Sequence, residues 1–414
     1  MYKKTLNHRA FFCISFLLCG IFATSAFSQN SYEFSVKVEK QTVYVDLNVK
    51  LDSAKRTFTF NDSAEISKIK TPDGQAIQYR RDSSTLVLDS EIREFEISYT
   101  LDKKTFSLDD GTLMLKKEGA WYPSVSNMSF TSKLNIEHDQ ETYYVVSGGY
   151  ISAGDYNLDF ANEVSLILLP MEYYTNQKYT ISDIEYQFYH YPDKILPEDM
   201  MRQFTDAASF FSDFFSDTPF NALNVVFLGP DNLQYAQSLN GIVIFDNFFT
   251  DLHVQNPKNS WIPHEVAHQW WGKSVLFDSE AQLYRFLEES FTEYLKTEFV
   301  KHSYSDSVYA SVFQTYKNSC DYVLGDNSKR LSIRDVRRLD NQENSIIIYC
   351  KGTLVLQKII EENDVNFKNF MRNFYHKFKG KQVSYFEFYN AFKEFSSSGA
   401  KALDIELQSH KKIW

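Results

Sequence analysis

The sequence predicts an α+β protein, with an N-terminal antiparallel β-sandwich domain followed by a mainly helical domain. Between residues 31 and 190, apolar and polar side chains alternate along short segments, as they do in half-buried strands. Near Pro197 the period changes, and apolar residues then recur at helical spacing. The 414 residues are 43% hydrophobic and 23% charged, which suits a globular chain of two or three domains.

The first residues have the pattern of a secretory signal, which we expect at 1–28. Basic residues precede an apolar run over 11–27, and the small residues Ala26 and Ser28 suit cleavage before Gln29. A retained membrane anchor is the alternative, although the run is short for a span. We therefore expect an exported protein, periplasmic or extracellular, with no stable membrane anchor after signal removal.

The β-sandwich domain is expected over residues 29–192. Turn-forming clusters such as the one at 72–74 separate its strands, and no repeat or low-complexity linker interrupts it. The alternation predicts strands at 35–39, 43–49, 86–88, 95–99, 134–138, 142–147, 163–169 and 183–190.

The second domain is expected over residues 193–414. It opens with a helix at 200–215, and two apolar strands follow at 223–228 and 241–245. The remaining segments with helical spacing lie at 281–302, 306–323, 344–361, 366–378 and 384–395.

The net charge of −11 indicates an acidic surface, which excludes nucleic acid as the expected partner because both would be anionic. Cys320 and Cys350 are the cysteines that remain after signal removal. In an exported protein they can form one disulfide, and two separate buried thiols are the alternative.

The stretch HEVAH at 264–268 predicts a zinc hydrolase. On a helix, His264 and His268 lie one above the other, and two neutral imidazoles at that spacing can bind one zinc ion. Zinc supplies a Lewis acid that acidifies water and polarises a carbonyl group. Glu265 lies beside the first histidine, where its carboxylate can accept the proton of an attacking water.

A catalytic zinc site needs a third protein ligand, and the next predicted helix offers three glutamates. Glu289 and Glu293 are four residues apart and share a face, so one can bind zinc while the other orients a ligand histidine. Glu288 points elsewhere, and we expect it at the surface.

Residues 264–272 (HEVAHQWWG) and 287–291 (LEESF) resemble the aminopeptidase N-like family of zinc metallopeptidases, the gluzincins. The resemblance implies a thermolysin-like catalytic domain with Glu289 as the third zinc ligand and Glu293 as the residue behind a ligand. Twenty residues separate His268 from Glu289 where the family usually has eighteen, which a two-residue insertion in the connecting loop explains.

The resemblance extends to residues 121–123 (WYP) and to residues 349–356 (YCKGTLVL). The second stretch is similar to a family motif whose tyrosine stabilises the oxyanion of the tetrahedral intermediate, and that role carries over to Tyr349. A phenol aimed at a developing negative charge is commonly worth about 3 kcal/mol.

One family motif is altered. Residues 236–243 (AQSLNGIV) stand where members have Gly-x-Met-Glu-Asn, which binds the free amino terminus of the substrate. Leu239 replaces the glutamate, and a leucine cannot bind an ammonium group. Asp231 or Asp246 can substitute if the loop folds back. The candidate substrate-binding residues are Gln237, Asn240 and Gly241.

The chain also stops near the end of the resemblance, so we expect a short member without the family's C-terminal helical domain and with an open groove. The resulting hypothesis is an exported, zinc-dependent, aminopeptidase-like metallopeptidase that acts on peptides or proteins. Three alternatives stay open: endopeptidase-like cleavage without a free amino terminus, zinc-dependent hydrolysis of a non-peptide bond, and a non-catalytic peptide-binding module on the same fold.

Overall fold

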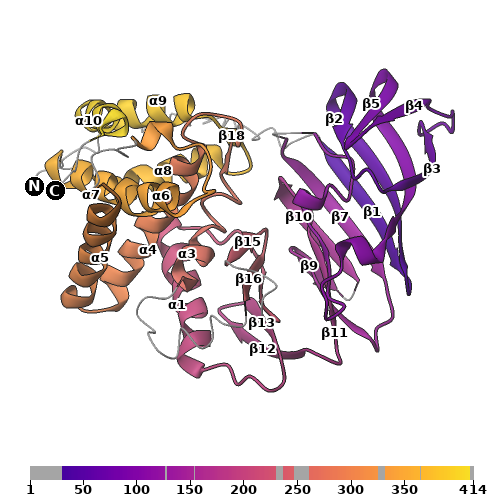
Figure 1. The fold of residues 1–414 in the computed structure, drawn as a ribbon, viewed down its shortest axis with the longest axis horizontal. Coiled ribbons are helices and arrows are strands. Elements are labelled where there is room, and N and C mark those ends of the chain that lie inside the picture. Colours follow the sequence, from indigo (N-terminus) through magenta and orange to yellow (C-terminus); the bar gives the residue numbers. More distant parts are fainter. Residues whose placement is uncertain are drawn as a thin grey trace, which may run out of the picture.

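A computed structural model of the chain describes residues 30–125, 128–152, 154–229, 236–246, 261–324, 332–363 and 365–410. The expected signal segment at 1–28 lies outside these residues. Figure 1 shows a β-rich N-terminal half, a helical C-terminal half, and a further sheet between them. The predicted α+β fold class is confirmed.

The N-terminal half is built on an eight-stranded sheet in the order β3-β5-β2-β1-β7-β10-β9, with β4 paired to β5. In β1, Phe34 and Val36 are buried while Glu33 and Lys37 face solvent, as the alternation predicted. The strands are β1 (Ser31–Val38), β2 (Thr42–Thr59), β3 (Glu65–Lys70), β4 (Tyr79–Asp82), β5 (Thr85–Asp102), β7 (Phe130–Glu137), β9 (Tyr150–Ser152) and β10 (Asp155–Ala161).

A second, three-stranded sheet shares the core of the first. It consists of β6 (Leu113–Leu115), β8 (Tyr143–Val146) and β11 (Leu166–Pro170), and the short 3-10 turns η1 (Lys103–Phe106) and η2 (Lys117–Gly119) flank β6. Trp121 lies at 0% exposure between the two sheets, and its Nε1 donates to the Val164 carbonyl at 3.0 Å. One detail differs from the prediction, because β1 and β7 pair in parallel.

The five-stranded sheet between the halves has the order β12-β13-β14-β16-β15. Its strands are β12 (Thr175–Ile181), β13 (Ile184–His190), β14 (Ala222–Leu228), β15 (Gln237–Leu239) and β16 (Ile242–Asp246). Because β13 pairs in parallel with β14, the predicted strand at 183–190 belongs to this sheet. The β-sandwich strands therefore end with β11, earlier than the predicted boundary at 192, since alternation identifies a strand but not its partner.

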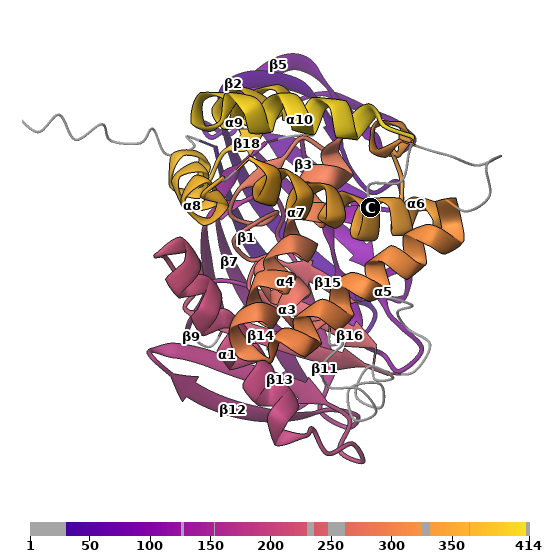
Figure 2. The same ribbon diagram turned by 90° about the vertical axis from the view of Figure 1, so that its left-hand side faces the viewer.

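The helices pack around this sheet, and Figure 2 shows several of them in front of the strands. The described residues contain no helix that is long and apolar enough to cross a membrane. The helices are α1 (Glu198–Phe215), α3 (Ile262–Ala267), α4 (Phe291–Ser303), α5 (Asp306–Leu324), α6 (Gln342–Ile346), α7 (Gly352–Glu362), α8 (Phe367–Phe378), α9 (Tyr385–Phe395) and α10 (Ser397–Gln408). This region also contains the 3-10 turn η6 (Ile333–Asp335) and a two-stranded sheet of β17 (Leu276–Phe277) and β18 (Gln382–Val383).

Two predicted helices each contain a π-helical turn. The helix predicted at 281–302 consists of η4 (Phe286–Ser290) and α4, and the helix predicted at 344–361 consists of α6, η7 (Ile347–Lys351) and α7. A π-helical turn inserts one residue into the helical repeat and commonly occurs at functional sites. The sequence pattern did not predict either turn, nor did it predict α10.

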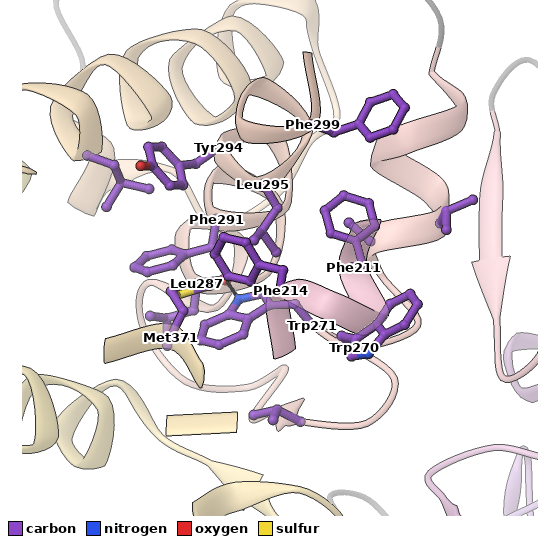
Figure 3. Close-up of a cluster of buried hydrophobic side chains, with 14 of the residues drawn as sticks. Phe211, Phe214, Trp270, Trp271, Leu287, Phe291, Tyr294, Leu295, Phe299 and Met371 are labelled. Atoms are coloured by element: carbon purple, nitrogen blue, oxygen red, sulfur yellow. Dashed lines mark hydrogen bonds between the residues drawn. The ribbon is translucent and has the colours of Figure 1, made fainter. Parts of the chain in front are cut away.

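Packing holds the short helix α3 in place, because six residues are too few for a stable isolated helix. Trp270 and Trp271 follow it and are fully buried among aromatic side chains (Figure 3). Trp271 stacks on Phe291 with ring centroids 5.4 Å apart, and its Nε1 donates to the Leu287 carbonyl at 2.6 Å. These contacts fix α3 against η4 and α4.

Cys320 on α5 and Cys350 on η7 are buried, free thiols. A hydrogen bond between the two thiols and burial both raise the pKa of Cys320, so the thiol stays protonated at neutral pH. The structure thus agrees with the alternative of two buried, unpaired thiols, and the two cysteines lie in the same apolar cluster.

Candidate metal centre

His264, His268 and Glu289 form a buried group whose ligand atoms all lie within 4.8 Å of one another. The two Nε2 atoms are 3.1 Å apart, and Glu289 Oε2 lies 3.4 Å from that of His264 and 3.5 Å from that of His268. Tetrahedral zinc with bonds of about 2.0–2.1 Å places its ligand atoms about 3.4 Å apart. The residues present therefore fit a zinc ion.

The other ring nitrogens show which atoms face the metal. His264 Nδ1 lies 2.7 Å from Glu293 Oε2, and His268 Nδ1 lies 3.1 Å from the Trp271 carbonyl oxygen. A carboxylate and a carbonyl only accept hydrogen bonds, so each Nδ1 carries the proton. Both Nε2 atoms then present lone pairs to the same point, and a cation is the species that satisfies both.

Sequence reasoning missed the partners that hold Glu293. The Tyr316 hydroxyl on α5 donates to its Oε1 at 2.5 Å, and Lys296 Nζ on α4 lies 2.7 Å from the same oxygen. Lys296 is three residues along the helix and could have been found by spacing. Tyr316 is brought in by the packing of α5 on α4, which no local pattern signals.

The cluster is strongly anionic. Burial favours the neutral form of Glu289, but the neighbouring imidazoles of His264 and His268 outweigh it and hold the pKa of Glu289 well below its ordinary value. Burial likewise opposes protonation of His264, yet Glu289 and Glu293 raise its pKa to about 10. Zinc and a proton therefore compete for one imidazole, and the surrounding charge favours a cation.

Replacing Glu293 with glutamine is expected to weaken zinc binding about 10- to 100-fold, because His264 loses the carboxylate that orients it. Tyr316→Phe should act in the same direction with a smaller effect. Competition with a chromogenic chelator measures both, and Glu298→Gln on the same helix is the matched control. An affinity of Glu293→Gln within twofold of wild type would contradict this arrangement.

Glu265 lies beside the metal ligands on α3 and is 5% exposed. The hydroxyl of Ser238 on β15 lies 2.6 Å from the Glu265 carbonyl oxygen and 2.8 Å from its Oε2. Ser238 therefore links strand β15 to the carboxylate of Glu265 by a hydrogen bond. Sequence reasoning missed it, although it alternates with Gln237 and Leu239 and so had to face away from them.

Tyr349 lies on the π-helical turn η7, and Glu289 lies on the π-helical turn η4. The Tyr349 hydroxyl donates to Glu289 Oε2 at 2.9 Å, and its ring centroid is 5.6 Å from that of His264. Burial and the charge of Glu289 raise the pKa of Tyr349 well above its usual range. The phenol is therefore a hydrogen-bond donor at neutral pH, next to the metal ligands.

The prediction that Glu288 lies at the surface is wrong. Glu288 is 8% exposed, and its Oε2 lies 3.3 Å from Arg285 Nη1, which is also 3.3 Å from Glu289 Oε1. The Glu288 side chain lies against Gly272, where the absence of a Cβ leaves room for it, whereas a regular exposed helix would have left it in solvent. Arg285 thus partly balances the charge of both glutamates.

The three candidate substrate-binding residues, Gln237, Asn240 and Gly241, have different roles in the structure. Asn240 Nδ2 donates to the Glu163 carbonyl at 3.2 Å, and the Gly241 N–H donates to Gln269 Oε1 at 2.8 Å. Both residues thus anchor the turn between β15 and β16, which leaves Gln237, half-buried on β15, as the candidate for substrate contact.

Leu239 is fully buried in an apolar cluster, so this position supplies no charge to the site. Asp246 is a buried carboxylate at the end of β16. Asp231 lies outside the described residues.

Comparisons with known proteins agree with this geometry. Residues 235–411 match the model of the peptidase family M1 domain. An M1 zinc metallopeptidase from Deinococcus radiodurans, solved with a Tyr-Ser-Ala substrate, is 14% identical, with 93% of this chain and 95% of that chain covered and a TM-score of 0.67. Yeast leukotriene A4 hydrolase in complex with bestatin is 14% identical, with 91% and 66% covered and a TM-score of 0.70.

No curated protein sequence matches the chain. The structural likeness shows the fold, the family model covers the segment with the metal ligands, and the ligand atoms have the separations that zinc requires. Residues 235–411 thus match the peptidase family M1 domain, and this segment carries the buried ligand set of a zinc metallopeptidase.

Proposed function

We propose that this chain is an exported peptidase that hydrolyses peptide bonds with Glu265 as general base and Tyr349 as oxyanion donor. The observation that carries the proposal is the placement of these two groups next to the ligand set of His264, His268 and Glu289. Export rests on the signal pattern at residues 1–28.

When bound, zinc supplies a Lewis acid that lowers the pKa of water and polarises the scissile carbonyl. Glu265 accepts the proton of the attacking water and returns it to the leaving nitrogen. Ser238 holds the carboxylate through its contact with Oε2, so the base has a defined direction. Tyr349 donates its phenolic proton in a hydrogen bond to the carbonyl oxygen as negative charge develops there.

The edge of β15 is suited to hold the peptide. β15 is the last strand of the five-stranded sheet, and β16 is its one strand partner among the described residues. β15 also packs against α3, which carries His264 and Glu265 and ends at His268. An extended peptide can pair with such an edge through its backbone and so align its carbonyl with the site.

The proposed activity is aminopeptidase-like in its machinery, and a second candidate is cleavage that needs no free amino terminus. The specific observation in favour of the second is that Leu239 is buried at the position where the family's carboxylate would bind the ammonium group. An ammonium group without a nearby opposite charge gains nothing from leaving water.

A pair of fluorogenic peptides, identical except for a free or an acetylated amino end, tests the proposal on the zinc-loaded protein. We expect hydrolysis that a chelator abolishes and zinc restores. Cleavage of the acetylated peptide at a similar or higher rate supports the second candidate. No hydrolysis of either peptide, or of a set of varied peptides at full zinc occupancy, would favour the non-catalytic binding module.

A further inference from the structure

A lysine from the β-sandwich contacts the strand next to the metal centre. Lys116 follows β6, is half-buried, and donates from Nζ to Gln237 Oε1 on β15 at 2.9 Å. Gln237 is its one hydrogen-bond or ion-pair partner within the described part of the chain. An ammonium group can donate three hydrogen bonds, so Lys116 has donors left for another acceptor.

The position of Gln237 places this lysine at the edge strand β15, which also contacts Glu265 through Ser238. The next residue, Ser238, touches Glu265, and side chains alternate along a strand, so Gln237 faces the opposite side of β15. An extended peptide on the edge of β15 also directs its groups alternately to these two sides. One side of β15 meets Glu265, and the other side meets Lys116.

We propose that Lys116, positioned by Gln237, is a specificity-determining residue that binds a carboxylate on the amino side of the scissile bond and disfavours a free ammonium group there. The inference rests on the proposed function, because it concerns the substrate of the same site. A half-buried cation with a neutral partner attracts an anion and repels a cation more strongly than it would in water. The substrates expected are peptides with an acidic or acidic-acylated amino end, or internal segments with an acidic residue there.

The carboxylate of Asp246, on the same side of the sheet, could determine the specificity in place of Lys116. Gln237 pairs with Ile244, and Asp246 lies two residues further along β16, so its side chain has the same facing as that of Gln237. If Asp246 governed this subsite, a free ammonium group would be preferred. The Asp246→Asn variant therefore separates the two arrangements.

The test measures binding as well as turnover. In a zinc-loaded Glu265→Gln background, fluorescence anisotropy gives the affinity of three peptides that differ only at the amino end, which is free, acetylated or succinylated. We expect the succinylated peptide to bind about tenfold more tightly than the free one. Lys116→Gln should abolish this preference and Lys116→Glu should reverse it, whereas Lys104→Gln, an exposed lysine of the same domain, should leave it unchanged.

Three results would overturn the inference. The first is a set of affinity ratios that both Lys116 variants leave within twofold of wild type, and the second is a preference for the free amine that Asp246→Asn removes. The third is that none of the three peptides binds. If the wild type hydrolyses peptides but the Lys116 variants leave the affinity ratios unchanged, the role of Lys116 is wrong and the proposed function stands. If peptide binding depends on Lys116 but the zinc-loaded wild type hydrolyses no peptide, the proposed function is wrong and the role of Lys116 in binding stands.

Discussion

Glu265→Gln is expected to lower the rate of peptide hydrolysis by about 10²–10⁴-fold, while the protein keeps its zinc. Glutamine has nearly the same shape and retains an oxygen for the hydroxyl of Ser238, which lies 2.8 Å from Oε2. It cannot accept the proton of an attacking water. The metal ligands are other side chains, so the loss should appear in kcat and not in zinc content.

The measurement combines steady-state kinetics with metal analysis of the same preparations. Glu362→Gln makes the identical substitution at an exposed position of α7 and should behave as wild type. A Glu265→Gln protein that holds zinc and keeps more than a tenth of the wild-type rate would remove Glu265 from its proposed role.

Tyr349→Phe is expected to lower kcat by about 10²–10³-fold with little change in KM. The phenol lies beside the ligand set, and burial together with Glu289 keeps its pKa well above its usual range. It therefore retains its proton at neutral pH and can donate to the carbonyl oxygen when that atom becomes negative. Because the charge forms only in the transition state, ground-state binding should change little.

The same hydroxyl contacts Glu289, so zinc content must be measured with the kinetics. Tyr322→Phe, at an 80% exposed position of α5, is the matched control. Loss of activity in proportion to loss of zinc would assign Tyr349 to holding the ligand. An unchanged kcat at full zinc occupancy would leave the oxyanion without this donor.

The local patterns of the sequence predicted most elements of the fold. Alternation in β1 and helical spacing in α1 arise from one buried face, and both recur in the structure. Partners across the sheets were harder to predict, because the strand at 183–190 shows the same alternation whichever neighbour it has. Its pairing with β14 depends on residues more than thirty positions away.

By itself, the sequence determined the nature of the site, because the spacing of His264, Glu265 and His268 within one turn of helix specifies their common direction. Only the tertiary structure decided the rest. The turn η4 brings Glu289 to the two histidines, and the packing of separate elements brings Ser238 and Tyr316 to the site and Lys116 to strand β15. The physical reason is that helical spacing acts between neighbours in the chain, whereas these contacts join segments that only the folded core places together.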